Sequence, residues 1–267
     1  MRRDHPSKLH AFLRDAFFDR PGGPRSPHAV TVALLLLGYS LACWYGFSRV
    51  AGDWGLVWNY RVAFVQGWFL TILISIAALF LSTAIGVAAA LARRSAFLPL
   101  RYTAAVYVES VRGLPLVVLI LFGFYVVANA LQWHDRFSAG IVILSLFSGA
   151  YIAEIIRAGV ESVGRSQWDS ARAIGLTTAQ TYRLVVFPQV LRQSLPPLAG
   201  QFSSIIKDSS LLFIIGITEV TFAAQQVASA TYSNLAAYLP LGLLYLALTL
   251  PVSLLTKWLE RRFRYET

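Results

Sequence analysis

Residues 65–91 read VQGWFLTILISIAALFLSTAIGVAAAL and contain no charged side chain. A helix needs about 20 apolar residues to cross the roughly 30 Å hydrocarbon core of a bilayer, and this stretch is longer than that. It therefore predicts a membrane-spanning helix and argues against a water-soluble globular fold.

Further apolar stretches of similar length lie on both sides of this one, each flanked by charge, proline or glycine. They run over residues 29–47, 102–130, 138–156, 195–222 and 238–256. The composition agrees, because 57% of the 267 residues are hydrophobic and 13% are charged, against roughly 45–50% and about 25% in a soluble domain. The sequence predicts an all-α integral membrane protein with about six transmembrane helices.

The positive charges predict how these helices are oriented. Six Lys and Arg residues precede the first span, three follow the second, five follow the fourth and four follow the sixth, whereas the outer connections hold three. Cytoplasmic segments carry the excess of Lys and Arg, so both termini are predicted to be cytoplasmic. The net charge of +10 is then explained by orientation. No nucleic-acid partner is expected, because the charge is scattered over four segments.

Two charged side chains interrupt the fifth predicted span. The run QFSSIIKDSS, residues 201–210, places Lys207 and Asp208 near its centre. Each charge costs about 2.5–3.5 kcal/mol on insertion scales, so pairing, water or a polar ligand must compensate for it. At about 100° per residue, Gln201, Ser204 and Asp208 lie on one stripe of the helix, beside Lys207. We expect this polar arc to face other helices or a water-filled path, whereas the opposite apolar arc can face lipid. That arc contains Leu198, Phe202, Ile205, Ile206, Leu212 and Phe213.

A second charged cluster, ESVRGLP at residues 109–115, lies in the third span. Glu109 and Arg112 are three residues apart, so we expect them to share a helix face and to neutralise each other in part. Pro115 removes a backbone hydrogen bond, which together with Gly113 predicts a break or kink. Broken helices at membrane depth commonly line a cavity.

The longest hydrophilic connection, residues 157–194, is predicted to contain short helices. Residues 166–169 are expected to cap the first helix, and Gly175 is expected to end it. Thr177 or Thr178 is expected to cap a second helix. By itself this pattern predicts only a helix, a glycine stop and another helix.

Residues 149–224 resemble the inner-membrane permease subunits of ABC importers, specifically the polar amino-acid uptake family of the histidine, glutamine and arginine permease type. The signature loop of that family has the form E-A-A, three residues, G, nine residues, I-x-L-P. This sequence follows the family spacing throughout, with Asp169, Ser170, Ala171, Gly175, Val185, Phe187 and Pro188 at the signature positions.

Two further stretches, residues 109–116 and 207–211, also resemble motifs of this family. Leu114 departs from the pattern, because many relatives have Thr there, and a hydroxyl contact is lost with it. The resemblance extends over roughly residues 65–259.

The resemblance implies the fold of a type I ABC importer permease, with a core of five transmembrane helices preceded by one N-terminal helix. The chain then divides into a basic cytoplasmic tail at 1–28, the extra helix with a periplasmic loop at 29–62, and the permease domain at 63–259. A cytoplasmic tail at 260–267 completes it, and the coupling loop at 157–194 lies within the permease domain.

The resemblance also implies a docking site for an ATPase on the coupling loop. A short surface helix, about Gln167 to Gly175, would insert into a cleft of the ATPase and transmit its closure to the spanning helices. Gly175 and Pro188 are expected to bound this rigid lever. The docking residues are expected to be Gln167, Trp168, Asp169, Ser170, Ala171, Arg172, Ala173, Gly175 and Pro188.

The implied partners are ABC ATPase subunits, a second permease subunit that is identical or homologous, and a periplasmic or lipid-anchored amino-acid-binding protein, at the bacterial inner membrane. No G-x-x-x-x-G-K-[ST] motif occurs, and the three lysines (Lys8, Lys207 and Lys257) lack its Gly-rich context. ATP and Mg are therefore expected on the partner ATPase. This chain is expected to hold no cofactor or metal of its own and to be a transport subunit, not an enzyme.

The implied activity is the inward movement of a polar or charged amino acid by alternating access. Arg112 and Lys207 are expected to meet the substrate carboxylate, and Asp208 with nearby hydroxyls its ammonium group. The residues expected along the path are Glu109, Arg112, Gly113, Leu114, Gln201, Ser204, Lys207, Asp208 and Ser209.

Other interpretations of the charged residues stay open. Both charged clusters are alternatively structural ion pairs, and Glu154 is expected to form an interfacial pair with Arg157. In an ion-coupled secondary transporter, Asp208, Glu109 or Glu154 would be the protonatable group, although no clear second copy of the segment 207–208 occurs. An integral-membrane enzyme is not expected, because the sequence has neither a cluster at metal-ligand spacing nor a G-x-S-x-G motif.

Overall fold

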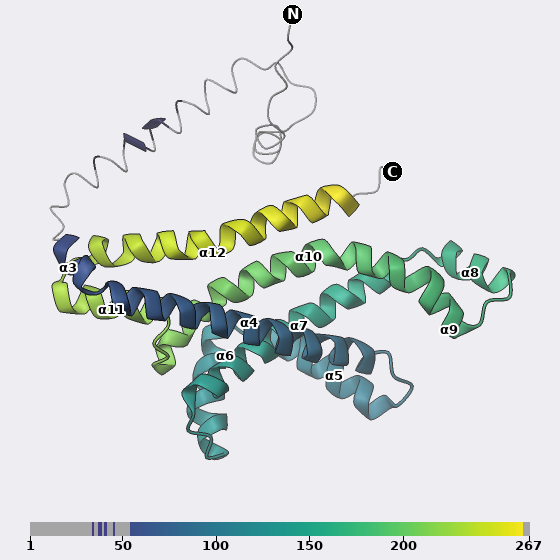
Figure 1. The fold of residues 1–267 in the computed structure, drawn as a ribbon. Coiled ribbons are helices and arrows are strands. Elements are labelled where there is room, and N and C mark those ends of the chain that lie inside the picture. Colours follow the sequence, from purple (N-terminus) through teal and green to yellow (C-terminus); the bar gives the residue numbers. More distant parts are fainter. Residues whose placement is uncertain (1–33, 35–36, 39, 42–44, 46–53, 264–267) are drawn as a thin grey trace, which may run out of the picture. The chain divides into compact units, whose positions relative to one another are not determined.

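The described part of the chain is helical almost throughout. The computed structural model describes residues 34, 37–38, 40–41, 45 and 54–263, and it contains no strand within them. The chain divides into two compact units, Met1–Trp54 and Gly55–Thr267, and helices α4 to α12 belong to the second (Figure 1). The predicted all-α fold is confirmed. The tail at 1–28 and residues 264–267 lie outside the described residues, and most of the predicted span at 29–47 does too.

The helices follow one another with short connections. Their bounds are α3 (Trp54–Asn59), α4 (Arg61–Ala92), α5 (Leu98–Arg112), α6 (Leu116–Phe122), α7 (Arg136–Glu161), α8 (Arg165–Ala173), α9 (Thr178–Thr181), α10 (Phe187–Asp208), α11 (Val220–Thr231) and α12 (Asn234–Phe263). A π-helical segment, Gly123–Ala128, continues α6. A second π-helical segment, Tyr182–Val186, joins α9 to α10. A 3-10 helix, Ser209–Ile215, continues α10.

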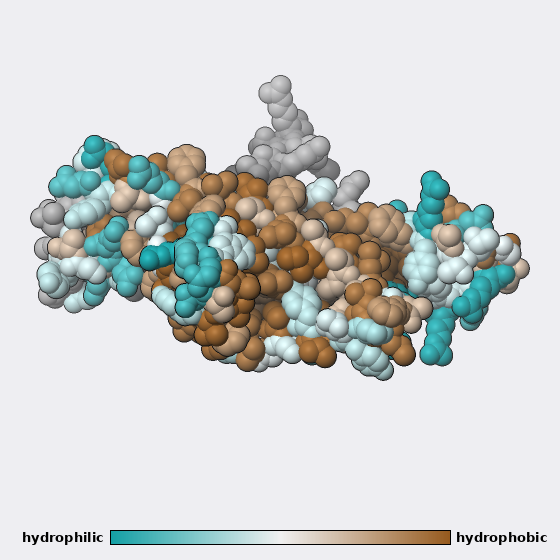
Figure 2. Space-filling view, turned by 90° about the horizontal axis from the view of Figure 1, so that it is seen from below, coloured by the Kyte–Doolittle hydropathy of each residue, from teal (hydrophilic) through white to brown (hydrophobic). Residues whose placement is uncertain are grey.

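Among the described residues, four continuous helical segments are long and apolar enough to cross a membrane. They are Arg61–Ala92, Arg136–Glu161, Thr178–Ile215 and Asn234–Arg261, and the bent pair Leu98–Arg112 and Leu116–Ala128 adds a fifth when it is counted as one span. Figure 2 shows hydrophobic side chains across the middle of this unit and hydrophilic ones gathered toward both ends of the view. This distribution suits a bundle that crosses a bilayer.

Helices α4 and α7 pack closely through glycines. A Cβ atom at Gly86 would lie 2.5 Å from Cγ2 of Ile152, and one at Gly149 would lie 2.8 Å from Cγ2 of Ile85. Small residues let membrane helices approach each other closely and pack over a long contact. The two glycines therefore determine the close approach at the centre of the bundle.

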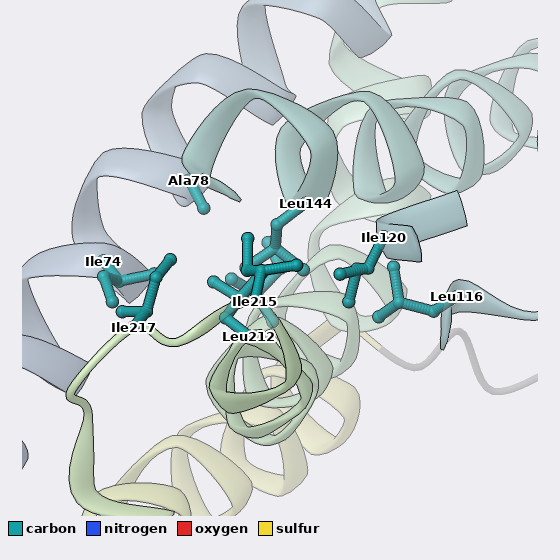
Figure 3. Packing of buried hydrophobic residues seen from close by; sticks show 9 residues of the cluster. Ile74, Ala78, Leu116, Ile120, Leu144, Leu212, Ile215 and Ile217 are labelled. Carbon is teal, nitrogen blue, oxygen red and sulfur yellow. The ribbon is translucent and has the colours of Figure 1, made fainter. Parts of the chain in front are cut away.

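The main hydrophobic core joins α4, α6, α7 and α10 (Figure 3). Its buried members are Ile74, Ala78, Leu116, Ile120, Leu144, Ile205, Leu212, Ile215 and Ile217. The sequence allows the apolar arc with Ile205 and Leu212 to face lipid, but both side chains are buried in this core. Lipid tails and a protein core are equally apolar, so the pattern does not distinguish them.

The predicted break in the third span is confirmed and is sharp. Helix α5 ends at Arg112, α6 begins at Leu116, and the two are bent by 112°. Pro115 has an extended backbone (ψ 139°) and stands directly before α6. It has no N–H with which to continue the α5 hydrogen bonds, and it disfavours helical geometry at the residue before it.

The fifth predicted span, residues 195–222, does not form one helix. Helix α10 ends at Asp208, a 3-10 helix runs on to Ile215, and Gly216 then adopts a left-handed conformation (φ 80°). A left-handed glycine commonly ends a helix because it lacks a Cβ. Lys207 and Asp208 therefore lie at the end of α10 and not at the centre of a helix reaching residue 222.

Candidate functional site

The connection between α7 and α10 contains the short helix that the sequence predicts. Helix α8 begins at Arg165, and Gly164 stands at the N-cap with no side-chain hydrogen bond. The predicted cap at residues 166–169 is wrong, because these residues already belong to the helix. Glycine is well accepted at an N-cap, so the helix starts without a polar side chain there.

The predicted glycine stop of α8 is confirmed in its details. Gly175 has a φ of +79°. Its N–H donates to the carbonyl of Arg172 over 2.9 Å, and the N–H of Leu176 donates to the carbonyl of Ala171 over 3.0 Å. These two bonds form a Schellman motif, which satisfies the last carbonyls of the helix.

A capping box starts the next helix, as expected for Thr177. The Thr177 hydroxyl accepts the Gln180 N–H over 3.3 Å, and Oε1 of Gln180 accepts the Thr177 N–H over 2.9 Å. The chain then continues through α9 and the π-helical segment Tyr182–Val186 into α10. A glycine stop and a capped helix thus follow α8 directly.

Pro188 does not end the helix that follows α8. It lies in the first turn of α10, and the segment Thr178–Ile215 is long and apolar enough to span the membrane as one unit. Proline is tolerated in a first turn, and the preceding π-helical segment changes the hydrogen-bond pattern where the proline N–H is missing. The prediction that Pro188 bounds the rigid lever is therefore wrong.

Most of the predicted docking residues project from α8. Ala171 is 2% exposed and anchors the helix, and Trp168 is half-buried. The exposed members are Gln167, Asp169, Ser170, Arg172, Ala173 and Gly175. Ile174 joins them although it is apolar and was not predicted, because its side chain is 76% exposed. The sequence signal for this exposed apolar residue was its position directly before the stop glycine.

Side chains from three segments meet behind α8. The rings of Trp168 and Tyr182 meet edge to face, with centroids 5.2 Å apart. Nη2 of Arg94, in the turn between α4 and α5, donates to the Tyr182 hydroxyl over 2.9 Å. The Arg94 guanidinium also lies 5.9 Å from the centre of the Tyr182 ring. Sequence reasoning missed Arg94 and Tyr182, because no local pattern brings residues so far apart in the chain together.

Glu154 of α7 is the centre of an ion-pair cluster. Its carboxylate contacts Nη1 of Arg93 at 3.2 Å, Nη1 of Arg112 at 3.4 Å and Nη2 of Arg157 at 2.5 Å. The expected pair with Arg157 is confirmed, but it is one of three. The expected pair between Glu109 and Arg112 is replaced, because Glu109 lies 3.5 Å from Arg93 instead. Arg112, directly before the bend, pairs with Glu154 of α7 instead.

The remaining predicted residues of the third span lie at the break. Gly113 has an ordinary helical φ of −81°, and its N–H donates to the carbonyl of Glu109 over 3.0 Å. Leu114 is 45% exposed. The Arg112 guanidinium lies 5.7 Å from the centre of the Tyr151 ring, and this contact holds the end of α5 against α7.

The predicted path residues of α10 have different neighbours. Lys207 is exposed, whereas Gln201, Ser204 and Asp208 are half-buried. The hydroxyls of Ser204 and Ser209 donate to helix carbonyls of Gly200 and Ile206 over 3.4 and 2.8 Å. Both hydroxyls are thus engaged by the helix itself. The structure places Glu109 and Arg112 in the Glu154 cluster and Lys207 and Asp208 at the end of α10.

Comparison with known families decides what kind of protein carries this arrangement. Residues 82–265 match the family model described as "Binding-protein-dependent transport system inner membrane component". The chain belongs to this family. That range includes α8, its glycine stop, the Glu154 cluster and the end of α10, so the predicted resemblance to permease subunits is confirmed.

Named relatives of this transport component are permease proteins. The probable glutamine ABC transporter permease protein GlnM of Bacillus subtilis (strain 168) is 36% identical over 199 residues, which cover 74% of this chain and 92% of that protein. The glutamine transport system permease protein GlnP of Escherichia coli (strain K12) is 34% identical over 214 residues, covering 79% and 98%.

A solved structure supports the fold of this transport component. A chain from the crystal structure of an amino acid ABC transporter with histidines has a TM-score of 0.74 and 32% sequence identity, covering 80% of this chain and 100% of that chain. The permease fold predicted for the spanning region is therefore confirmed.

One buried acidic residue of this transport component escaped the sequence analysis. Glu219 is fully buried and caps α11, accepting the N–H groups of Thr221 and Phe222 over 2.9 and 3.1 Å. Its carboxylate also accepts the hydroxyl of Tyr245 over 2.9 Å and lies 3.4 Å from that of Thr71. The available sequence signal was a glutamate that lies two residues before Thr221 and three before Phe222, whose N–H groups belong to the first turn of a helix. It was missed because one continuous span was predicted there.

Within the described residues, no group of three or more His, Cys, Asp and Glu side chains is placed to hold a metal ion.

Proposed function

We propose that this chain is the membrane-spanning permease subunit of an ATP-driven amino-acid importer in the bacterial inner membrane. The observation that supports it most directly is α8, a short helix ended by a Schellman motif at Gly175 and presenting its polar residues outward. Such a helix is a defined, rigid projection from the bundle. Residues 169–188 also follow the signature spacing of the permease family that the chain resembles, which supports α8 as the docking helix.

In this proposal α8 inserts into a separate ATPase subunit. Gln167, Asp169, Ser170 and Arg172 offer polar contacts, and the exposed Ile174 offers an apolar one at the end of the helix. Ala171 fastens the helix to the permease from its opposite side. Energy comes from the partner, which holds ATP and Mg, and the permease itself carries out no catalysis.

The exposure of Lys207 supports the presence of a second permease subunit. This side chain is exposed on the single chain although it lies in a segment that spans the membrane. A lysine does not face hydrocarbon without compensation, so its face meets water or another protein chain. In the assembled transporter, Lys207 and Asp208 face the path, and Arg112 lies at the break in α5 and α6.

The proposed cargo is a polar or charged amino acid. The two relatives named above are glutamine permeases, and the structural match is a chain of an amino acid transporter. A cationic and an anionic side chain next to each other, at Lys207 and Asp208, complement the carboxylate and ammonium groups that every free amino acid carries. A periplasmic or lipid-anchored binding protein delivers this cargo.

The N-terminal part of the chain is an addition to this permease in our proposal. Residues 1–28 form a basic cytoplasmic tail and residues 29–62 an extra helix with a periplasmic loop. The permease domain at 63–259, with its coupling loop at 157–194 and a short cytoplasmic tail at 260–267, carries transport. The family match supports placing transport in the C-terminal part, because it begins at residue 82 and runs to residue 265.

A pull-down tests the proposal. The tagged chain is extracted from its native membrane in mild detergent, and bound proteins are identified by mass spectrometry. We expect a P-loop ATPase to copurify. A Gly175→Val variant should lose the ATPase, because a β-branched residue does not adopt a φ of +79° without strain. A matched Gly200→Val variant should keep it, since Gly200 lies in α10 and not in α8, and an added Cβ there meets no atom within 4 Å.

Two results would contradict the proposal. Full ATPase binding by Gly175→Val would remove α8 as the docking element. Reproducible absence of an ATPase from the folded wild-type chain would favour an ion-coupled secondary transporter instead.

A further inference from the structure

The turn between α4 and α5 holds two neighbouring arginines that contact opposite parts of the molecule. Arg93 lies 3.2 Å from Glu154 of α7 and 3.5 Å from Glu109 of α5. Arg94 instead donates to the hydroxyl of Tyr182, which begins the π-helical segment after α9. The turn thus contacts the spanning bundle through one residue and the loop that carries α8 through the next.

On the side of α8, the contact runs through two aromatic rings. Arg94 is bonded to Tyr182 over 2.9 Å, and the Tyr182 ring packs edge to face against Trp168 at 5.2 Å. Trp168 lies in the middle of α8 and is half-buried. π-Helical segments such as the one that Tyr182 begins are often found at functional sites. A shift of α8 therefore reaches Arg94 through direct contacts.

On the side of the bundle, the contact runs to the break in the third span. Arg93 and Arg112 share one oxygen of Glu154, Oε2, at 3.2 and 3.4 Å. Arg112 is the last residue of α5, and the 112° bend to α6 follows it. A displacement of Arg93 therefore changes the position of the carboxylate that also holds the end of α5.

We propose that Arg93 and Arg94 form a link that transmits movement of α8 to the break between α5 and α6. This proposal rests on the proposed docking of an ATPase on α8. Because the two arginines are neighbours in a short turn, a shift of the turn backbone displaces both side chains. Both are positioning residues, since they act through Glu154 and Tyr182.

A purely structural role explains Arg93 better than Arg94. Arg93 belongs to a cluster that joins α4, α5 and α7, and such a cluster holds helices together by itself. Arg94 is exposed, and exposed charged contacts contribute little to stability. Its hydrogen bond to Tyr182 serves to connect the turn with the loop, so Arg94 is the residue at which transmission and folding are separable.

The test uses the complex of the full chain with its copurified ATPase, in lipid nanodiscs. Cys43→Ser removes the single cysteine of the chain. Leu114→Cys then introduces a labelling site at the break, where the native side chain is 45% exposed. The probe is a water-soluble maleimide, and the readout is its rate of reaction with and without Mg-ATP and vanadate. We expect nucleotide to change the rate in this background.

Arg94→Ala should reduce the nucleotide-dependent change in labelling rate about fivefold, the lower end of common coupling effects. Tyr182→Phe, which removes the hydroxyl and keeps the ring, should have an effect in the same direction. The double variant should be no worse than Arg94→Ala alone, because both changes remove one contact. Arg94→Lys, which keeps a cation and a donor, should restore part of the response.

The matched control is Arg101→Ala. Arg101 is exposed and forms no ion pair or side-chain hydrogen bond with any residue that the structure describes, and its substitution should leave the response intact. Copurified ATPase and its hydrolysis rate should be unchanged in both alanine variants, because neither alters the exposed residues of α8.

The outcomes separate this proposal from the proposed function. Failure of the ATPase to copurify with the wild-type chain contradicts the proposed function. A bound ATPase combined with a wild-type response in Arg94→Ala overturns the link alone. A bound ATPase with no nucleotide response at residue 114 in the parent also overturns the link, since the break then does not follow α8.

Discussion

Arg112 of α5 pairs with Glu154 of α7, with Nη1 and Oε2 3.4 Å apart, although Glu109 lies one turn away on its own helix. The pairing matters because Arg112 is the last residue before the 112° bend. Glu154 also holds Arg93 and Arg157. One carboxylate thereby joins the ends of α4 and α5 to α7, close to the segment that carries α8.

Glu154→Gln should destabilise the bundle. The amide removes the negative charge that balances three guanidinium groups, and breaking partly buried ion pairs leaves like charges close together. We expect the midpoint of thermal unfolding in detergent to fall by about 5 °C. Glu161→Gln is the control, because Glu161 contacts Arg157 alone among the ion pairs described and is 59% exposed. Equal midpoints for the two variants would contradict a central role for Glu154.

The sequence predicts those features that are determined locally. The apolar length of the spans, the break at Pro115 and the stop at Gly175 follow from hydropathy, a missing N–H and a left-handed conformation, each within a few residues. The partners of Glu154 and the contact between Arg94 and Tyr182 depend on how distant helices pack. For the same reason, the sequence does not determine whether the apolar arc with Ile205 faces lipid or the core, where the structure places this residue.

Gly67→Ala should prevent correct packing of α4 against α11. A Cβ at Gly67 would lie 2.9 Å from Cα and 3.0 Å from N of Val220, and these backbone atoms have little freedom to move away. Overpacking of this kind costs about 1–3 kcal/mol. We expect less monodisperse protein by fluorescence-detected size-exclusion chromatography. Gly200→Ala should behave like wild type, because no atom lies within 4 Å of its added Cβ; a normal profile for Gly67→Ala would show that the contact relaxes.

Glu219→Ala should loosen the start of α11. The N–H groups of Thr221 and Phe222 would lose their side-chain acceptor, at a cost of about 1–3 kcal/mol for buried polar groups. Faster hydrogen exchange over residues 220–224 is the expected result. Tyr245→Phe removes one donor to the carboxylate and should show a smaller increase. Unchanged exchange in Glu219→Ala would mean that water replaces the cap.

Asp135 should make the start of α7 sensitive to acid. Hydrogen bonds from Ser138 and from the Phe137 N–H hold the pKa of this carboxyl below its usual value. The folded pKa is lowered, so this stabilisation is present above the ordinary value of 3.8 and is lost as the pH falls through the folded pKa. Protection of the amides at residues 137–139, measured relative to their intrinsic exchange rates at each pH, should fall on acidification in wild type. Asp135→Asn, which caps without titrating, should lack that fall, and an identical profile would exclude the cap as its cause.

Asp208→Asn should separate a path role from a structural one. Asp208 is half-buried and Lys207, beside it, is exposed on the single chain, and our proposal assigns both residues to the path of a polar or charged amino acid. If Asp208 contacts the ammonium group of the cargo, the amide should reduce uptake of radiolabelled L-glutamine, the substrate class named for two relatives. The expected loss is at least about tenfold, corresponding to roughly 1.4 kcal/mol, with the ATPase still bound.

Glu260→Gln, at an exposed carboxylate near the end of α12, should leave both uptake and assembly unchanged. Loss of the whole complex in Asp208→Asn would instead identify Lys207 and Asp208 as a structural pair, because removing a charge from an intramembrane pair then exposes the remaining one to an apolar environment.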